Sequence, residues 1–302
     1  MSQGSVEASV QLPAETPGAA SEAKSRRAVW AICGLIAITV AVYAPILRYM
    51  TLQWYADENY SHGFLIAPLA AFFAWERRGR LRQAAIAPSW WGLLPLALGT
   101  LTLMIGRLGT ELMNMRVSFV LTLIGLVLLL LGRQIFRVLA FPLLFLFLMV
   151  PLPESLVNVI AFPLQLVAAD LAVKALFLLG VPALREGNII HLANSKLFVA
   201  EACSGLHSLV ALITLGVVFA YFFRKSLVER VVIVLSAIPI AILVNSFRVA
   251  LTGVLTARFG EQVAGGVIHE TQGLFTFGLA FVLLLGEAAL LARLRRLWSH
   301  RP

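Results

Sequence analysis

The sequence predicts an all-α polytopic membrane protein with about eight transmembrane helices, a re-entrant or interfacial segment and a short extracytoplasmic β-hairpin. Three observations favour this fold class. The 302 residues are 60% hydrophobic and only 13% charged, and their mean hydropathy is +0.90. The apolar residues form runs long enough to cross about 30 Å of hydrocarbon. Most basic residues stand at the ends of these runs, where they orient membrane helices.

The rest of the composition indicates a single membrane domain. Residues 1–27, rich in Ser, Ala, Pro and Glu, predict a disordered cytoplasmic tail and show no secretory signal peptide. Residues 28–292 predict one transmembrane domain, and residues 293–302 predict a basic cytoplasmic tail. The net charge of +9 does not indicate a nucleic-acid partner, because the basic residues follow the helix ends. The two cysteines, Cys33 and Cys203, lie in different settings, so no disulfide is expected.

Eight apolar runs predict the spans. Three basic residues precede the first run: Lys24, Arg26 and Arg27. They hold the start of this span in the cytoplasm, and its orientation sets the direction of each later span. Both chain ends are then expected in the cytoplasm. The runs cover about residues 28–47, 62–75, 88–107, 117–131, 138–150, 206–223, 231–247 and 273–292.

Residues 155–183 are apolar enough to span but contain Pro163, Asp170 and Lys174. The two charges are four residues apart and can pair on one helical face. We interpret this segment as interfacial or re-entrant, with both ends on the outer side. That topology places 16 of the 24 Lys and Arg residues inside and 8 outside. A ninth span here would put the basic residues of the last three spans outside, against the positive-inside rule.

Residues 185–202 follow this segment and resemble β-structure. Two short β-like runs flank Ala193-Asn194-Ser195-Lys196, which has the composition of a turn. A small hairpin on the outer face is expected.

Three residues with complementary chemistry are expected at the outer ends of spans. Cys203 begins the sixth span, Arg248 ends the seventh and His269 precedes the eighth. A helix N-terminus and a nearby cation lower the pKa of a thiol. A histidine can exchange the thiol proton with a leaving amine, and an arginine can hold an oxyanion. Together they fit acyl transfer on a peptide bond at the membrane surface.

Each candidate also has a structural interpretation, and other residues could support or replace it. Cys203 could be a small apolar side chain, Arg248 could extend to the interface, and His269 could be an ordinary interfacial histidine. Glu201 and Asn245 flank the three and could orient them, while outward-facing His62 is an alternative base. We expect no metal and no cofactor, because HExxH or CxxC spacing is absent.

Several short motifs carry a resemblance to a known family. They are Glu201-Ala202-Cys203-Ser204-Gly205-Leu206, Asn245-Ser246-Phe247-Arg248, His269 before Gly273, Tyr60-Ser61-His62-Gly63, Pro151-Leu152-Pro153 and Arg185-Glu186-Gly187-Asn188. In this order and spacing, from about residue 30 to 292, the chain resembles the exosortase/archaeosortase family.

The resemblance implies a multi-span cysteine protease or transpeptidase of the bacterial inner membrane, with its active site on the periplasmic face. Cys203 would be the nucleophile, His269 the acid/base, and Arg248 the oxyanion donor. Its partners would be membrane lipid and exported proteins with a C-terminal sorting signal: a Pro-Glu-Pro-like motif, a transmembrane helix and a basic cluster. The family often accompanies exopolysaccharide production. His207 stands where many members have Arg, which could mark a different signal.

A rival hypothesis is a non-catalytic membrane component of exopolysaccharide export, or a transporter. The pair Asp170 and Lys174 would suit a conduit, although most spans lack charges at mid-depth. A membrane acyltransferase or rhomboid-like serine protease is disfavoured, because no clear GxSxG motif is present.

Overall fold

The computed structural model describes the backbone of residues 17–57, 60–193, 195–199, 205–223, 226–260 and 267–299. Side chains are described for residues 34–57, 60–193, 195–199, 209–222, 226–260, 271–293 and 295.

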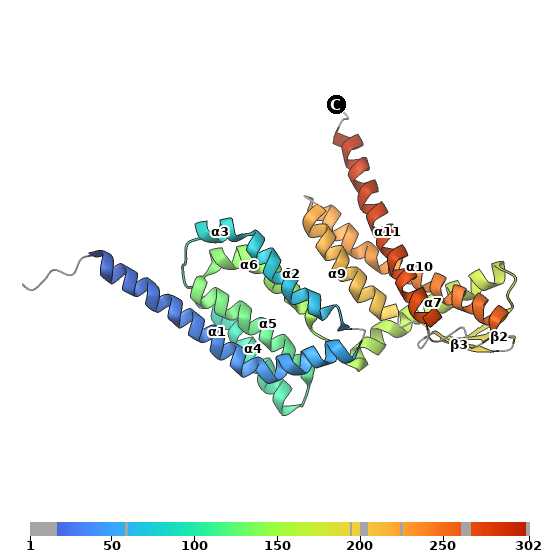
Figure 1. Ribbon diagram of the computed structural model, residues 1–302, viewed down its shortest axis with the longest axis horizontal. Helices are drawn as coiled ribbons and strands as arrows, with labels where there is room; N and C mark the ends of the chain where they lie inside the picture. Colours follow the sequence, from blue (N-terminus) through green and yellow to red (C-terminus); the bar gives the residue numbers. More distant parts are fainter. Residues whose placement is uncertain are drawn as a thin grey trace, which may run out of the picture.

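Helices in an N-terminal half and a C-terminal half make up most of the chain, and Figure 1 shows the two halves beside each other. The N-terminal half contains α1 (Pro17–Ala56), α2 (Gly63–Glu76), α3 (Arg78–Gln83), α4 (Leu93–Leu108), α5 (Leu112–Leu126) and α6 (Arg133–Phe145), with the short turns η2 (Trp90–Gly92), η3 (Val127–Leu131) and η4 (Leu146–Met149). The C-terminal half contains α7 (Glu154–Leu178), β1 (Ala183–Glu186), β2 (Ile189–Leu192), β3 (Lys196–Phe198), α9 (Gly205–Phe223), α10 (Leu227–Phe259) and α11 (Val267–Ser299).

Long apolar helices confirm the predicted fold class. Among the described residues, 6 helices are long and apolar enough to cross a membrane: Gly34–Ala56, Trp90–Leu108, Leu112–Leu131, Glu154–Leu178, Leu227–Phe259 and Thr271–Arg293. Gly63–Glu76 and Leu209–Phe222 are shorter apolar helices. Many large apolar side chains face outward on these helices, as expected where lipid replaces water.

One end of the helix bundle, called here the basic end, gathers arginines from distant parts of the chain. The Arg77 Nε donates to the Tyr221 hydroxyl at 3.1 Å, and its Nη1 donates to the Val138 carbonyl at 2.7 Å. Arg295 pairs with Glu229 at 3.6 Å. These contacts place the ends of α2, α9 and α11 and the start of α10 together. The opposite end, which carries β1–β3, is called the sheet end.

Helix α7 begins and finishes at the sheet end. Just before its start, the Leu152 carbonyl accepts a 3.0 Å hydrogen bond from the Tyr60 hydroxyl, close to where α2 begins. Near its finish, Leu176 packs against Gly253 in the last third of α10. Both ends of the segment 155–183 were expected on one side of the protein. Both ends of α7 lie at the sheet end, and the helix between them is continuous and runs obliquely in Figure 1. No break interrupts the helix, although it contains Pro163.

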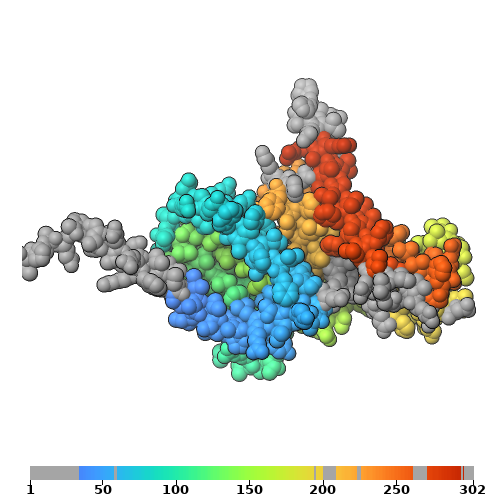
Figure 2. Space-filling view, in the orientation of Figure 1, coloured from blue at the N-terminus to red at the C-terminus, as the bar shows by residue number. Residues whose placement is uncertain are grey.

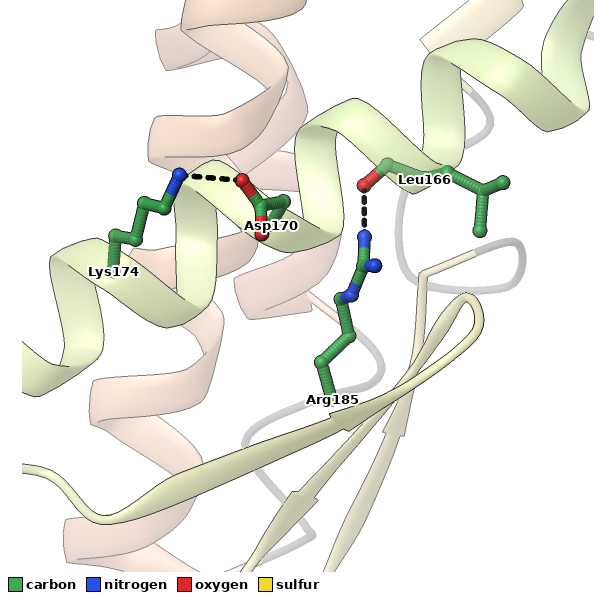
Figure 3. Close-up of polar contacts among 4 residues, drawn as sticks. All are labelled: Leu166, Asp170, Lys174 and Arg185. Carbon is green, nitrogen blue, oxygen red and sulfur yellow. Dashed lines mark hydrogen bonds and ion pairs between the residues drawn. The ribbon is translucent and has the colours of Figure 1, made fainter.

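Two charged side chains of α7 pair with each other on the surface of the helix. The Lys174 Nζ is 2.7 Å from Asp170 Oδ2, and the two side chains are 68% and 45% exposed. Beside them, Arg185 Nη1 donates to the Leu166 carbonyl at 2.9 Å, which ties β1 to α7 (Figure 3). Charges in or near hydrocarbon are commonly paired in this way.

The sheet is antiparallel, with strand order β1-β2-β3. The expected hairpin is β2–β3, in which Ile190 pairs with Leu197. The strand β1, whose Leu184 pairs with His191, was not predicted from the sequence. Gly187, with φ +63°, turns the chain between β1 and β2, in a backbone conformation that favours glycine.

Helix α10 is longer than a bilayer is thick. Its 33 residues extend about 50 Å, against about 30 Å of hydrocarbon. Starting at the basic end, α10 reaches Arg248 after about 32 Å. Beyond that point, Val249 and Ala250 join a separate apolar core with Ala172 and Ile190. The last turns of α10, the second half of α7 and the sheet therefore form a cap at the sheet end.

The helical segments at both chain ends are longer than expected. Helix α1 begins at Pro17, so residues 17–27, expected in a disordered tail, are helical. Proline suits the first helical position, and the alanines that follow favour a helix. Helix α11 continues to Ser299, so most of the expected basic tail extends the last helix.

Candidate functional site

Arg248 lies where α10 meets α11 at the inner edge of the cap. Its side chain is half-buried. The guanidinium lies against Gly273 of α11, since a Cβ there would stand 3.6 Å from Arg248 Nη2 and 3.9 Å from Cζ. The absence of a side chain at Gly273 therefore gives the guanidinium a position directly on the backbone of α11.

His269 belongs to the same helical face as Gly273. It precedes Gly273 by four residues within α11, which is about one turn, or 6 Å along the axis. The side chain of His269 lies outside the described residues. The backbone alone places the His269 position one turn from the residue that Arg248 contacts.

A hydrogen-bonded polar cluster holds α10 and α11 together beside Arg248. The Thr252 hydroxyl oxygen is 2.8 Å from Gln272 Oε1 and 2.9 Å from the Arg248 carbonyl oxygen, so its proton is shared between two acceptors. Gln272 is 6% exposed and Thr252 is 1% exposed. This buried bond fixes the register of the two helices, and with it the position of Arg248 relative to His269.

Asn245 links the site to α9. It is 8% exposed and precedes Arg248 by one turn on α10. A small cavity lies between Asn245, Leu209 of α9 and Gln165 of α7. Leu209 is one turn after Gly205, the first residue of α9. Three helices thus approach one another around Asn245.

Cys203 and Glu201 lie outside the described residues. Covalent geometry keeps Cys203 within about 7 Å of Gly205, because Cys203 is only two positions earlier in the chain. The helix that follows Cys203 packs against α10, which carries Arg248, and α11 packs against α10. The structure therefore packs α9, which begins two positions after Cys203, and α11, which carries His269, against α10. Of the three candidates it describes the side chain of Arg248 alone.

A family comparison is consistent with this arrangement. The sequence model of transmembrane exosortases matches residues 54–286, which is most of the chain. The chain belongs to the transmembrane exosortase family. The matched part contains Cys203, Arg248 and His269. No protein of curated function and no solved structure gives a significant match to the chain.

His62 of this exosortase lies in the N-terminal half, directly before α2, which packs against α1 and α6. A Cβ on the next residue, Gly63, would overlap the Trp54 indole. Glycine at this position therefore lets Trp54 pack directly against the backbone. Trp54 Nε1 in turn donates to the Met149 carbonyl at 3.1 Å. His62 thus directly precedes a helix of the N-terminal half, whereas Arg248 lies on α10 of the C-terminal half.

Two further motifs of the exosortase have structural roles. Tyr60 bonds the Leu152 carbonyl of Pro151-Leu152-Pro153, and burial together with Asp57 raises the pKa of the Tyr60 phenol. It therefore remains a donor at neutral pH. Asn188, in the turn between β1 and β2, donates to Gln165 Oε1 at 3.4 Å. Both motifs position α7.

Thr252, Gln272 and Gly273 were not identified as site residues from the sequence. A signal was present, because Arg248, Thr252 and Thr256 recur one turn apart in an apolar helix. Thr271-Gln272 also follows His269 directly.

The contact at Gly273 makes a size-dependent prediction for the exosortase. Gly273→Ala should keep activity, because its Cβ meets Arg248 at an ordinary contact distance of 3.6 Å. If Arg248 is the oxyanion donor, Gly273→Leu should displace the guanidinium and reduce turnover by about 100-fold. Processing of a reporter substrate, normalised to enzyme level, measures both variants. Gly286→Leu is the control, since open space surrounds Gly286. Equal activity of Gly273→Leu and the control would contradict a role for this contact.

Proposed function

We propose that this exosortase is a membrane-embedded cysteine protease or transpeptidase that cleaves the C-terminal sorting signals of exported proteins. Its substrate carries a Pro-Glu-Pro-like motif, a transmembrane helix and a basic cluster. Cys203 attacks the carbonyl carbon of the scissile peptide bond and forms a thioester. His269 takes the thiol proton and gives it to the leaving amine. Water or an acceptor amine then attacks the thioester and releases the product.

One observation carries the proposal: the Arg248 guanidinium lies against α11 one turn from His269. The oxygen of a tetrahedral intermediate needs a fixed donor in the half-buried region where its charge develops. Arg248 can donate two hydrogen bonds from a planar group, and the Thr252–Gln272 bond holds the helices on either side. Asn245 and Glu201 are proposed as supporting residues.

Replacing Arg248 by lysine tests this role. Arg248→Lys keeps the positive charge but loses the planar donor fork, so turnover should fall by about 100-fold. The substrate is a reporter protein fused to a Pro-Glu-Pro motif, an apolar helix and a basic cluster. Its processing is measured as a shift in its molecular mass in membranes. Arg258→Lys, near the end of α10, is the matched control. If Arg248 only anchored the helix at the interface, lysine would extend equally well and activity would survive.

The proposed orientation puts the basic end in the cytoplasm and the site outside. In a cysteine-free variant, Ser195→Cys in the β2–β3 connection should react only with a thiol reagent added from the periplasmic side. Gly79→Cys, an exposed position at the basic end, should react only from the cytoplasm. Cytoplasmic labelling at Ser195→Cys would reverse the topology.

A further inference from the structure

A large cavity opens at the basic end between the two halves of the protein. It has a volume of about 470 Å³ and lies between the α2–α3 connection and the α9–α10 hairpin. Figure 2 shows the α3 region of the N-terminal half next to the α9–α10 region. Arg77, Arg80 and Arg230 line the cavity, with Glu76 as the acidic residue among its lining residues. The lining therefore has a net formal charge of +2, three guanidinium groups against one carboxylate.

The cavity at the opposite end has the reverse charge. It has a volume of about 370 Å³, and Arg116 lines it together with Asp57, Glu111 and Glu154. One cation against three carboxylates gives a net formal charge of −2. Of these two cavities of similar size, the one at the basic end is complementary to an anion.

An apolar groove continues from the basic cavity toward the middle of the bundle. It has a volume of about 350 Å³ between α6, α9 and α10. Phe141, Val217 and Val231 are among its apolar lining residues. Tyr221 and Arg230 line both spaces, so the two are contiguous. The combined surface is cationic at the bundle end and apolar beneath it.

We propose that this surface binds one anionic phospholipid, with the phosphate among Arg77, Arg80 and Arg230 and an acyl chain in the groove. Arginine binds phosphate with paired, charge-assisted hydrogen bonds. Basic pockets between membrane helices suit anionic headgroups. A membrane-spanning peptide fits less well, because its cytoplasmic end usually carries positive residues, which would face three arginines. The inference does not depend on the proposed enzymatic activity.

Arg80 and Arg230 are the residues to change. Arg77 also bonds Tyr221 and Val138, so its removal would disturb packing. Arg80 and Arg230 are exposed at the rim. Arg82 is equally exposed on α3 but lies outside the cavity lining, which makes it the matched control.

Native mass spectrometry of the purified full-length protein in detergent measures the headgroup contribution. Phosphatidylglycerol should bind more tightly than phosphatidylcholine. Arg80→Gln and Arg230→Gln should each weaken phosphatidylglycerol binding by about fivefold, as expected for one surface cation. Arg82→Gln should leave binding nearly unchanged. Equal losses for Arg80→Gln and Arg82→Gln, or no preference between the two lipids, would overturn the proposal.

A second pair of variants tests the acyl chain. Val231 and Val232 are neighbours on α10 and are 47% and 38% exposed, but only Val231 lines the groove. Val231→Trp should fill the groove and weaken phosphatidylglycerol binding, whereas Val232→Trp should not. Inorganic phosphate should compete poorly, because it lacks an acyl chain. Strong competition by phosphate, or equal effects of the two tryptophans, would identify a simple anion site and reject the lipid.

Discussion

Replacing Cys203 by serine is expected to leave a folded exosortase that does not process its substrate. A serine hydroxyl is far harder to ionise than a thiol near neutral pH, so no thiolate nucleophile forms. The reporter with a Pro-Glu-Pro motif, an apolar helix and a basic cluster should remain at full length. Loss of a nucleophile from a catalytic unit should reduce turnover by at least about 10³-fold. The measurement is the fraction of reporter cleaved in membranes per amount of enzyme.

Cys33→Ser is the matched control, because Cys33 lies in α1, within the first apolar run. Cys33→Ser should process the reporter normally. The same pair separates the enzyme from the rival hypothesis, since a non-catalytic export component or transporter would tolerate either serine. Normal reporter cleavage by Cys203→Ser would rule out Cys203 as the nucleophile.

Removing the imidazole of His269 should be nearly as damaging. Without an acid/base, the thiol keeps its proton and the leaving amine receives none, so His269→Ala should lose about 10²- to 10⁴-fold in turnover. His62→Ala should retain most of its activity, because His62 starts α2 in the N-terminal half. The same reporter assay compares the two variants at equal enzyme levels.

Comparing His269→Ala with His62→Ala is informative, because the sequence does not decide which histidine is the base. Both histidines were expected on the outer face, and hydropathy cannot decide which one approaches Arg248. Full processing by His269→Ala together with loss in His62→Ala would move the base to the N-terminal half.

Much of the fold was predictable because membrane insertion imposes simple rules on sequence. The basic residues at the run ends argue against a crossing by residues 155–183, and contacts near both ends of α7 lie at the sheet end. Hydropathy alone counts α7 among the possible spans. The charge pattern gives the opposite prediction, because Asp170 and Lys174 would be costly within a span. The two side chains pair with each other on the surface of α7.

The parts that were missed depend on contacts between distant residues. β1 is four residues long and is stabilised by pairing with β2 and by the Arg185–Leu166 bond to α7. Thr252 and Gln272 look like isolated polar residues until α10 and α11 are packed. A single sequence shows which residues carry chemistry, but not which of them share a helix interface.

The halves meet through aromatic rings at the basic end. The Tyr221 ring lies 4.5 Å from the Phe73 ring and stacks on Phe141 with centroids 4.6 Å apart. Each half also has its own buried core. This aromatic junction borders the proposed lipid site, so a bound lipid would contact both halves.

The length of α10 gives the exosortase a built-in measure of depth. Arg230 in its first turn and Arg248 at the edge of the cap are 18 residues apart, which is about 27 Å along the helix. Under the proposed function, a scissile bond held at Arg248 would therefore lie about 27 Å from the level of Arg230, close to the ~30 Å thickness of the hydrocarbon. The distance of that bond from the opposite membrane surface would then help to select it, as well as the residues around it.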